Sequence, residues 1–141
     1  MTNLAKYILI PESKLLLCKY QGETYLEDII KLTRRYISDK AFDASFSAII
    51  DFRSCHLIGF GTEVYDFVDF IRNNYTLQTV FRNGILVNTD NQENLMNIYK
   101  PLAKEIKLEI ELFRDLNDCV TWLKIPEEKH SFIARTLSNM L

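Results

Sequence analysis

The feature of this chain that most constrains its fold is the alternation of short apolar runs with longer amphipathic stretches. Phe46 to Phe52 and Gly84 to Val87 are nearly continuous in apolar character, as expected for strands covered on both faces. Apolar residues at helical spacing follow each run, over 64–71 and 95–106. Strands that alternate with helices predict right-handed crossovers and a mostly parallel sheet with helices packed against it.

The two ends of the chain add to this pattern. Apolar runs at 5–10 and 14–20, split by Pro-Glu-Ser, predict an opening hairpin. Residues 107–113 alternate between apolar and polar side chains, which indicates a strand at or near a sheet edge with one wet face. The stretch 126–141 carries an apolar stripe that either docks on its own sheet or forms a homodimer contact. We therefore expect an α/β fold with a single mixed, mostly parallel sheet of four or five strands and four or five helices.

Polar residues mark the expected helix starts. Thr24 and Glu27 form the pattern of a capping box, in which both side chains satisfy free amides at the start of the first helix. Thr89 or its neighbour is expected to cap the third helix, and Asp115 the fourth. Pro101 lies inside the third helix, and we expect it to kink or split that helix because its ring removes a hydrogen bond.

Length and composition limit the class of protein. The chain has 141 residues, 48% of them hydrophobic and 26% charged, which predicts one globular domain with a core over about 5–124 and a C-terminal helical extension over 126–141. The net charge is −2 and the cations are dispersed, so nucleic acid is not expected as a partner. We expect no signal peptide or membrane span, and three widely spaced cysteines indicate reduced thiols in a cytoplasmic protein.

With its elements in this order, the chain resembles the STAS or SpoIIAA-like family, including the STAS/SEC14-like subgroup. The resemblance covers about residues 7–123 and rests on GETYLED at 22–28, FD at 42–43, IIDFR at 49–53, LF at 112–113 and DCVTWL at 118–123. It implies a SpoIIAA/STAS-like fold. In the anti-anti-sigma factors of this fold, a serine in Asp-Ser-Ser-Gly at the start of the second helix is phosphorylated. Residues 58–63 read Ile-Gly-Phe-Gly-Thr-Glu here, so the resemblance does not bring that switch to this chain.

Asp51 and Arg53 are the first candidate binding residues. They follow the predicted central strand, and open α/β sheets bind ligands at the carboxyl ends of their strands. The alternative is that they form an ion pair, or that Asp51 organises a loop.

The loop before the second helix supplies further candidates. Glycines at 59 and 61 let backbone amides approach an anion at a helix start, but Glu63 adds negative charge and the glycines equally suit a tight turn. Gly61 and Thr62 are candidate binding residues on this basis. Thr62 is alternatively a simple helix cap.

Aromatic residues beside the second helix are the last candidates. Phe60, Tyr65, Phe70 and Tyr75 lie next to a helix stripe that is already filled by other apolar residues. They indicate an exposed interface or, alternatively, burial beneath neighbouring loops. We include Phe60 and Tyr65 among the candidate binding residues.

Catalytic and metal-binding patterns are not evident. Cys55 and His56 are adjacent, which is poor geometry for one metal ion, and the second histidine is His130, far along the chain. No third group orients a Cys/His pair for nucleophilic catalysis. We expect no metal, no cofactor and no enzymatic activity.

The sequence thus predicts a non-enzymatic, STAS-like regulatory or protein-interaction domain that binds another protein or itself through the second helix and its preceding loop. The alternative is a carrier or sensor of a small apolar or anionic ligand, bound near the end of the third strand and the start of the second helix. A closed, well-packed interior would favour the first function, and a continuous apolar pocket of a few hundred cubic ångströms or more would favour the second.

Overall fold

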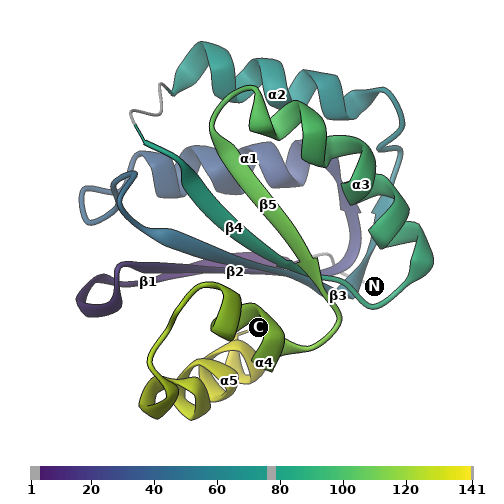
Figure 1. Ribbon diagram of the computed structural model, residues 1–141. Helices are drawn as coiled ribbons and strands as arrows, with labels where there is room; N and C mark the ends of the chain where they lie inside the picture. Colours follow the sequence, from purple (N-terminus) through teal and green to yellow (C-terminus); the bar gives the residue numbers. More distant parts are fainter. Residues whose placement is uncertain (1–3, 76–78, 141) are drawn as a thin grey trace.

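The computed structural model describes residues 4–75 and 79–140. The strands are β1 Leu4–Ile10, β2 Leu15–Tyr25, β3 Ser47–Ile58, β4 Phe81–Leu86 and β5 Leu108–Phe113. The α-helices are α1 Leu26–Ile37, α2 Glu63–Asn74, α3 Asp90–Lys104, α4 Leu116–Trp122 and α5 His130–Asn139, with short 3-10 helices at Pro11–Ser13 and Glu127–Lys129. The elements form three layers: α1, α2 and α3 lie on one face of the sheet, and α4 and α5 lie on the other (Figure 1).

The sheet has the strand order β1-β2-β3-β4-β5. β1 is antiparallel to β2, and the other neighbouring pairs are parallel. This confirms the predicted opening hairpin and the mixed, mostly parallel sheet, with the strand through Asp51 in the interior. It also confirms that residues 107–113 form an edge strand. Glu109 on that strand is exposed, in agreement with the predicted wet face.

The helix starts agree with the sequence in part. Thr89 Oγ1 accepts a hydrogen bond from the Gln92 amide at 3.1 Å, and Asp115 Oδ1 accepts one from the Asn117 amide at 2.9 Å, so both predicted caps are confirmed. Thr62 precedes α2, but its side chain makes no capping hydrogen bond. Thr62 therefore occupies the predicted N-cap position but does not cap the helix through its side chain.

The predicted capping box at Thr24 and Glu27 is wrong. β2 continues to residue 25 because it pairs with β3 as far as Ile58, and α1 begins only at Leu26. Thr24 is buried and its hydroxyl donates to the Gly22 carbonyl, whereas the Asp28 carboxylate accepts the amide of Tyr25 at 2.8 Å.

Pro101 does not split the third helix, contrary to one form of the prediction. α3 is continuous from Asp90 to Lys104 with Pro101 inside it. Tyr99 and Ala103, on either side of the proline, are both buried in the core. Packing of this helix face therefore holds both halves in one helix even though proline supplies no backbone donor.

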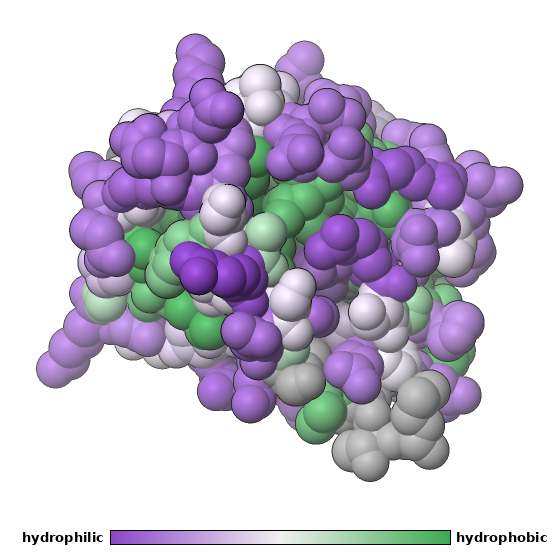
Figure 2. Space-filling view, turned by 90° about the horizontal axis from the view of Figure 1, so that it is seen from below, coloured by the Kyte–Doolittle hydropathy of each residue, from purple (hydrophilic) through white to green (hydrophobic). Residues whose placement is uncertain are grey.

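The second face of the sheet is covered by α4 and α5, and α4 packs against β4 and β5. Ile133 and Leu137 of α5 are each 1% exposed and share a core with Leu17 and Ile49 of the sheet. Seen from this side, hydrophilic residues cover most of the surface, with hydrophobic residues visible between them (Figure 2). The apolar stripe of the C-terminal helix thus docks on its own sheet through Ile133 and Leu137, which is one of the two outcomes that the sequence left open, while Phe132 on the same helix is 47% exposed.

Candidate functional site

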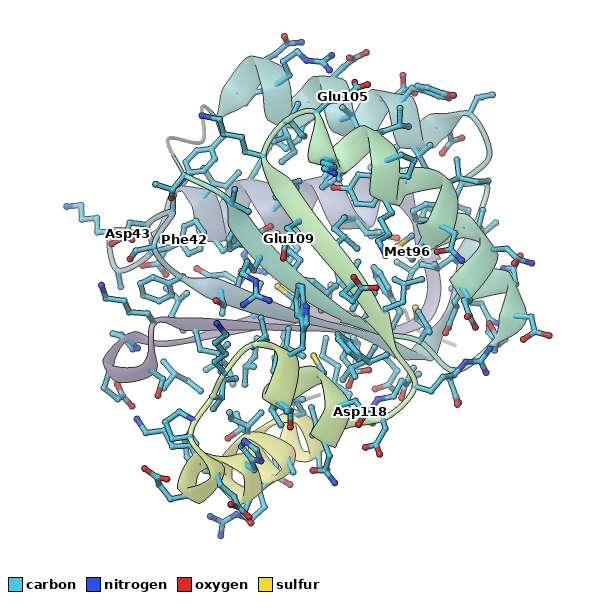
Figure 3. The ribbon with its side chains drawn as sticks, viewed as in Figure 1. Phe42, Asp43, Met96, Glu105, Glu109 and Asp118 are labelled. Atoms are coloured by element: carbon cyan, nitrogen blue, oxygen red, sulfur yellow. The ribbon has the colours of Figure 1, made fainter. Side chains whose placement is uncertain are left out.

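An apolar cavity of about 80 Å³ lies between the sheet and the helices α1, α2 and α3. Side chains from these three helices and from strands β2 to β5 line it. Phe42, from the connection between α1 and β3, and Met96, from α3, lie toward opposite ends of this layer (Figure 3). The cavity therefore extends along the layer between the helices and the sheet.

Helix α2 forms the wall farthest from the sheet. It packs mainly against α1 and α3, and in Figure 1 it runs along the top of the helical layer. Val64, Phe67 and Ile71, one helical turn apart, direct their side chains to the cavity. The apolar stripe that predicted this helix thus serves as the roof of a cavity.

A β-bulge shapes the opposite wall. The register of β2 and β3 shifts between Lys19 and Gln21, so that one residue, Tyr20, faces two on β3, Phe52 and Arg53. The rings of Tyr20 and Phe52 lie 5.2 Å apart, centroid to centroid, and both line the cavity. The bulge therefore places two aromatic side chains in the floor of the site.

Four tyrosines line this otherwise apolar cavity: Tyr20, Tyr36, Tyr75 and Tyr99. Burial raises the pKa of Tyr20 and Tyr99 well above the usual phenol value, and it also raises the pKa of Tyr36 and Tyr75. These phenols stay protonated and uncharged at neutral pH. They supply hydrogen-bonding groups within apolar walls, which is the usual composition of a small-molecule site.

No lining residue of the cavity, in the part of the chain that the structure describes, carries a charge. The remaining polar lining groups are the Thr33 hydroxyl and the Asn83 amide. Thr33 donates to the Ile29 carbonyl at 2.7 Å, and Asn83 donates to the Phe81 carbonyl at 3.4 Å. The cavity suits an uncharged molecule, because an ion there would lose its hydration without gaining a partner.

The structure places Asp51 and Arg53 on the other face of the sheet. Asp51 is 1% exposed and accepts three hydrogen bonds from Arg53, each of 3.0 Å, from the backbone amide, Nε and Nη2. The hydrogen bonds to Asp51 raise the pKa of Arg53, whose other charged neighbour is Asp115 beside α4. The buried Asp51 carboxylate thus finds its hydrogen-bond donors in Arg53, and the bond from the Arg53 amide holds the backbone of β3 at the bulge.

Of the other candidates, only Phe60 contributes to the cavity, where it is 3% exposed. Gly61, Thr62 and Tyr65 are exposed around the start of α2. Phe70 is also buried, so the aromatic residues near α2 mostly fill the interior and Tyr65 alone is prominent at the surface. The structure thus separates the six candidates into a buried ion pair, one cavity residue and an exposed helix start.

The three cysteines of the chain are buried and reduced. Burial raises the pKa of Cys55 and Cys119 to about 12, and it also raises the pKa of Cys18. Such thiols are poor nucleophiles because the reactive thiolate is scarce. Among residues 4–75 and 79–140, no group of three or more His, Cys, Asp or Glu side chains is placed to hold a metal ion. A membrane-crossing helix would have to be longer and more apolar than any helix in these residues.

No protein-family model matches the chain, and no curated protein matches it either. A solved structure does: an uncharacterised protein of the DUF3478 family from Shewanella loihica PV-4, which has a SpoIIAA-like fold. The two structures align with a TM-score of 0.56 over 86% of this chain and 93% of that chain, at 18% sequence identity. The chain has a SpoIIAA-like fold. At this identity the likeness concerns the SpoIIAA-like fold alone, which confirms the resemblance seen in the sequence.

Sequence reasoning missed the residues that give the SpoIIAA-like domain its cavity. Tyr20 lies in an apolar run and Tyr99 in a helical stripe, so both were expected to serve the core. A signal was available, because a buried tyrosine carries a hydroxyl that requires a partner. The sequence does not show that Tyr20 on β2 and Tyr99 on α3 line the same cavity.

Proposed function

We propose that this SpoIIAA-like domain is a non-catalytic binding domain that holds a small apolar molecule between the sheet and α2, as a carrier or sensor. The single observation that carries the proposal is the cavity of about 80 Å³, with apolar walls and phenol groups from two sides. Natural cores contain few voids larger than a water molecule, because unfilled space weakens packing. A cavity of this size in a small domain therefore supports a binding role.

The cavity volume limits the ligand. It is smaller than the few hundred cubic ångströms expected of a complete small-molecule pocket, and about half of the roughly 150 Å³ of an engineered apolar cavity that binds benzene. A ring therefore requires the cavity to widen. α2 is the wall that can move, because it packs mainly against two helices and is not a part of the sheet.

Protein binding through α2 was the stronger expectation from the sequence. That expectation rested on extra aromatic residues beside the apolar stripe of α2. Two of them, Phe60 and Phe70, are buried. Tyr65, at 53% exposure, is the only one of that group with a large exposed area. The burial of Phe60 and Phe70 thus removes most of the support for an aromatic docking surface on α2.

Titration with toluene, followed by methyl NMR of the full chain, tests the proposal. We expect saturable shifts at Met96, Ile85 and Ile110, which line the cavity, and none at Ile133 and Leu137 on the other face of the sheet. Absence of saturable shifts, or equal shifts on both faces, would contradict it.

A matched pair of variants sharpens this test. Val64→Leu adds a methylene group to the cavity wall and should weaken toluene binding without loss of stability. Val120→Leu makes the same change in the close-packed core beneath α4, where overpacking typically lowers the free energy of unfolding by about 1–3 kcal/mol. Toluene binding should be unchanged in the second variant.

A further inference from the structure

Two phenol groups in the cavity lack a protein partner. Tyr20 is 2% exposed and Tyr99 is 8% exposed, and neither hydroxyl forms a hydrogen bond with a protein group in the residues that the structure describes. In those residues, every side-chain nitrogen or oxygen that is fully shielded has a partner. The two phenol oxygens are therefore not fully shielded, and both tyrosines line the cavity.

Tyr7, which lies outside the cavity, shows the contrast. Its hydroxyl donates to the Asp39 carboxylate at 2.8 Å. Tyr20 and Tyr99, which come from β2 and α3, line the same cavity. Two tyrosines whose hydroxyls are unpaired therefore line one apolar space. A buried hydroxyl without a partner is destabilising, so this arrangement indicates a missing hydrogen-bonding group.

We propose that the cavity takes an uncharged molecule with an apolar body and at least one oxygen atom, such as an alcohol, a phenol or a ketone, whose oxygen pairs with the hydroxyls of Tyr20 and Tyr99. This inference rests on the proposed function and names its ligand class. Carboxylates and phosphates are disfavoured because no described cation lines the cavity.

Water can take the place of a ligand oxygen beside Tyr20 and Tyr99. A water molecule can satisfy buried polar groups that have room for it, and displacing such a water by a group without hydrogen bonds loses affinity. A ligand oxygen reproduces those hydrogen bonds, whereas a methyl group of the same size does not. The phenol groups of Tyr20 and Tyr99 should therefore distinguish two ligands that differ only in this respect.

Phenol and toluene form such a pair, since a hydroxyl in one replaces a methyl group in the other. Calorimetric titration of the full chain gives the ratio of the toluene Kd to the phenol Kd. We expect the ratio to fall about tenfold in the Tyr20→Phe/Tyr99→Phe double variant, as the loss of a buried hydrogen bond predicts. Tyr7→Phe is the matched control, because Tyr7 lies outside the cavity, and it should leave the ratio unchanged.

The outcomes distinguish failure of the ligand class from failure of the proposed function. An unchanged ratio in the double variant, with toluene still bound, overturns the ligand class and leaves the proposed function standing. Loss of saturable binding for both probes in the wild-type chain overturns the two together. Benzoate should bind at least tenfold more weakly than phenol, and equal affinity also overturns the ligand class. Should the double variant fold poorly, the single variants Tyr20→Phe and Tyr99→Phe, which retain the ring, provide the same ratio.

Discussion

The side-chain amide nitrogen of Gln92 lies 2.7 Å from the carbonyl oxygen of Phe52. It also donates to the Cys55 carbonyl at 2.8 Å, while its own carbonyl oxygen accepts the Asn88 amide at 2.6 Å. β4 pairs with β3 only as far as Asp51, so the carbonyls beyond that point have no strand beside them on this side. Gln92, which is 2% exposed, supplies the donors that a longer β4 would have supplied. One side chain thus fixes the end of β3 next to the cavity floor.

Replacing this amide should be strongly destabilising. Gln92→Leu keeps the approximate size but leaves buried carbonyls of Phe52 and Cys55 unpaired, and we expect the free energy of unfolding to fall by about 2–4 kcal/mol. Urea denaturation measures the loss. Asn91→Leu, at an exposed position on the same turn, should change stability by no more than about 0.5 kcal/mol. Equal stability of the two variants would show that the Gln92 bridge contributes little.

The C-terminal helix should be needed for stability. Leu137→Ala removes a side chain that is 1% exposed, and we expect a loss of about 2–5 kcal/mol in the free energy of unfolding. Phe132→Ala, on the same helix but 47% exposed, should have a much smaller effect. Deleting residues 128–141 should likewise give an unfolded or aggregated product. A soluble, folded product would instead support the predicted core over about 5–124, with α5 as an extension.

Asp39 should make stability depend on acid. Hydrogen bonds from the Ala41 amide at 3.0 Å and the Tyr7 hydroxyl at 2.8 Å lower the pKa of Asp39. The unfolded chain therefore takes up this proton at a higher pH than the folded chain, so acid favours unfolding. The contribution is present above the unfolded pKa of about 3.9 and is lost as pH falls through the lower folded value.

Comparison with Asp39→Asn isolates this effect. The stability advantage of the wild-type chain over the variant should be present at about pH 6 and should shrink at about pH 2.5. Urea midpoints at the two pH values measure it. Asn73→Ser, at an exposed and uncharged position on α2, serves as the control and should show no such trend. A constant difference between wild type and Asp39→Asn would contradict the assigned hydrogen bonds.

The order of the elements could be predicted from the sequence, because apolar residues repeat with one spacing in strands and with another in helices. The continuous apolar run at Phe46 to Phe52 and the alternation at 107–113 fixed an interior and an edge strand, and both predictions are confirmed. The end of β3 was predicted too early. Residues 53–58 have no apolar run, and they form a strand only because β2 pairs with them.

The candidate site was less predictable, because it depends on which face of the sheet each side chain occupies. Asp51 and Phe52 are neighbours in sequence, yet they lie on opposite faces, so Asp51 pairs with Arg53 and Phe52 lines the cavity. The predicted ligand site included both Asp51 and Phe60, because both lie near the end of the third strand. Successive side chains of a strand point to opposite faces of the sheet, so this site combined residues from two faces. The bulge at Tyr20 has no sequence signal of its own.

Intermolecular nuclear Overhauser effects between a bound ligand and the protein methyl groups locate the ligand most directly. With phenol bound to the full chain, we predict effects to the methyl groups of Met96, Ile85 and Ile110, all of which line the cavity beneath α2. Effects to Ile133 and Leu137 beneath the sheet, or no effects to any cavity residue at saturating phenol, would contradict binding between the sheet and α2.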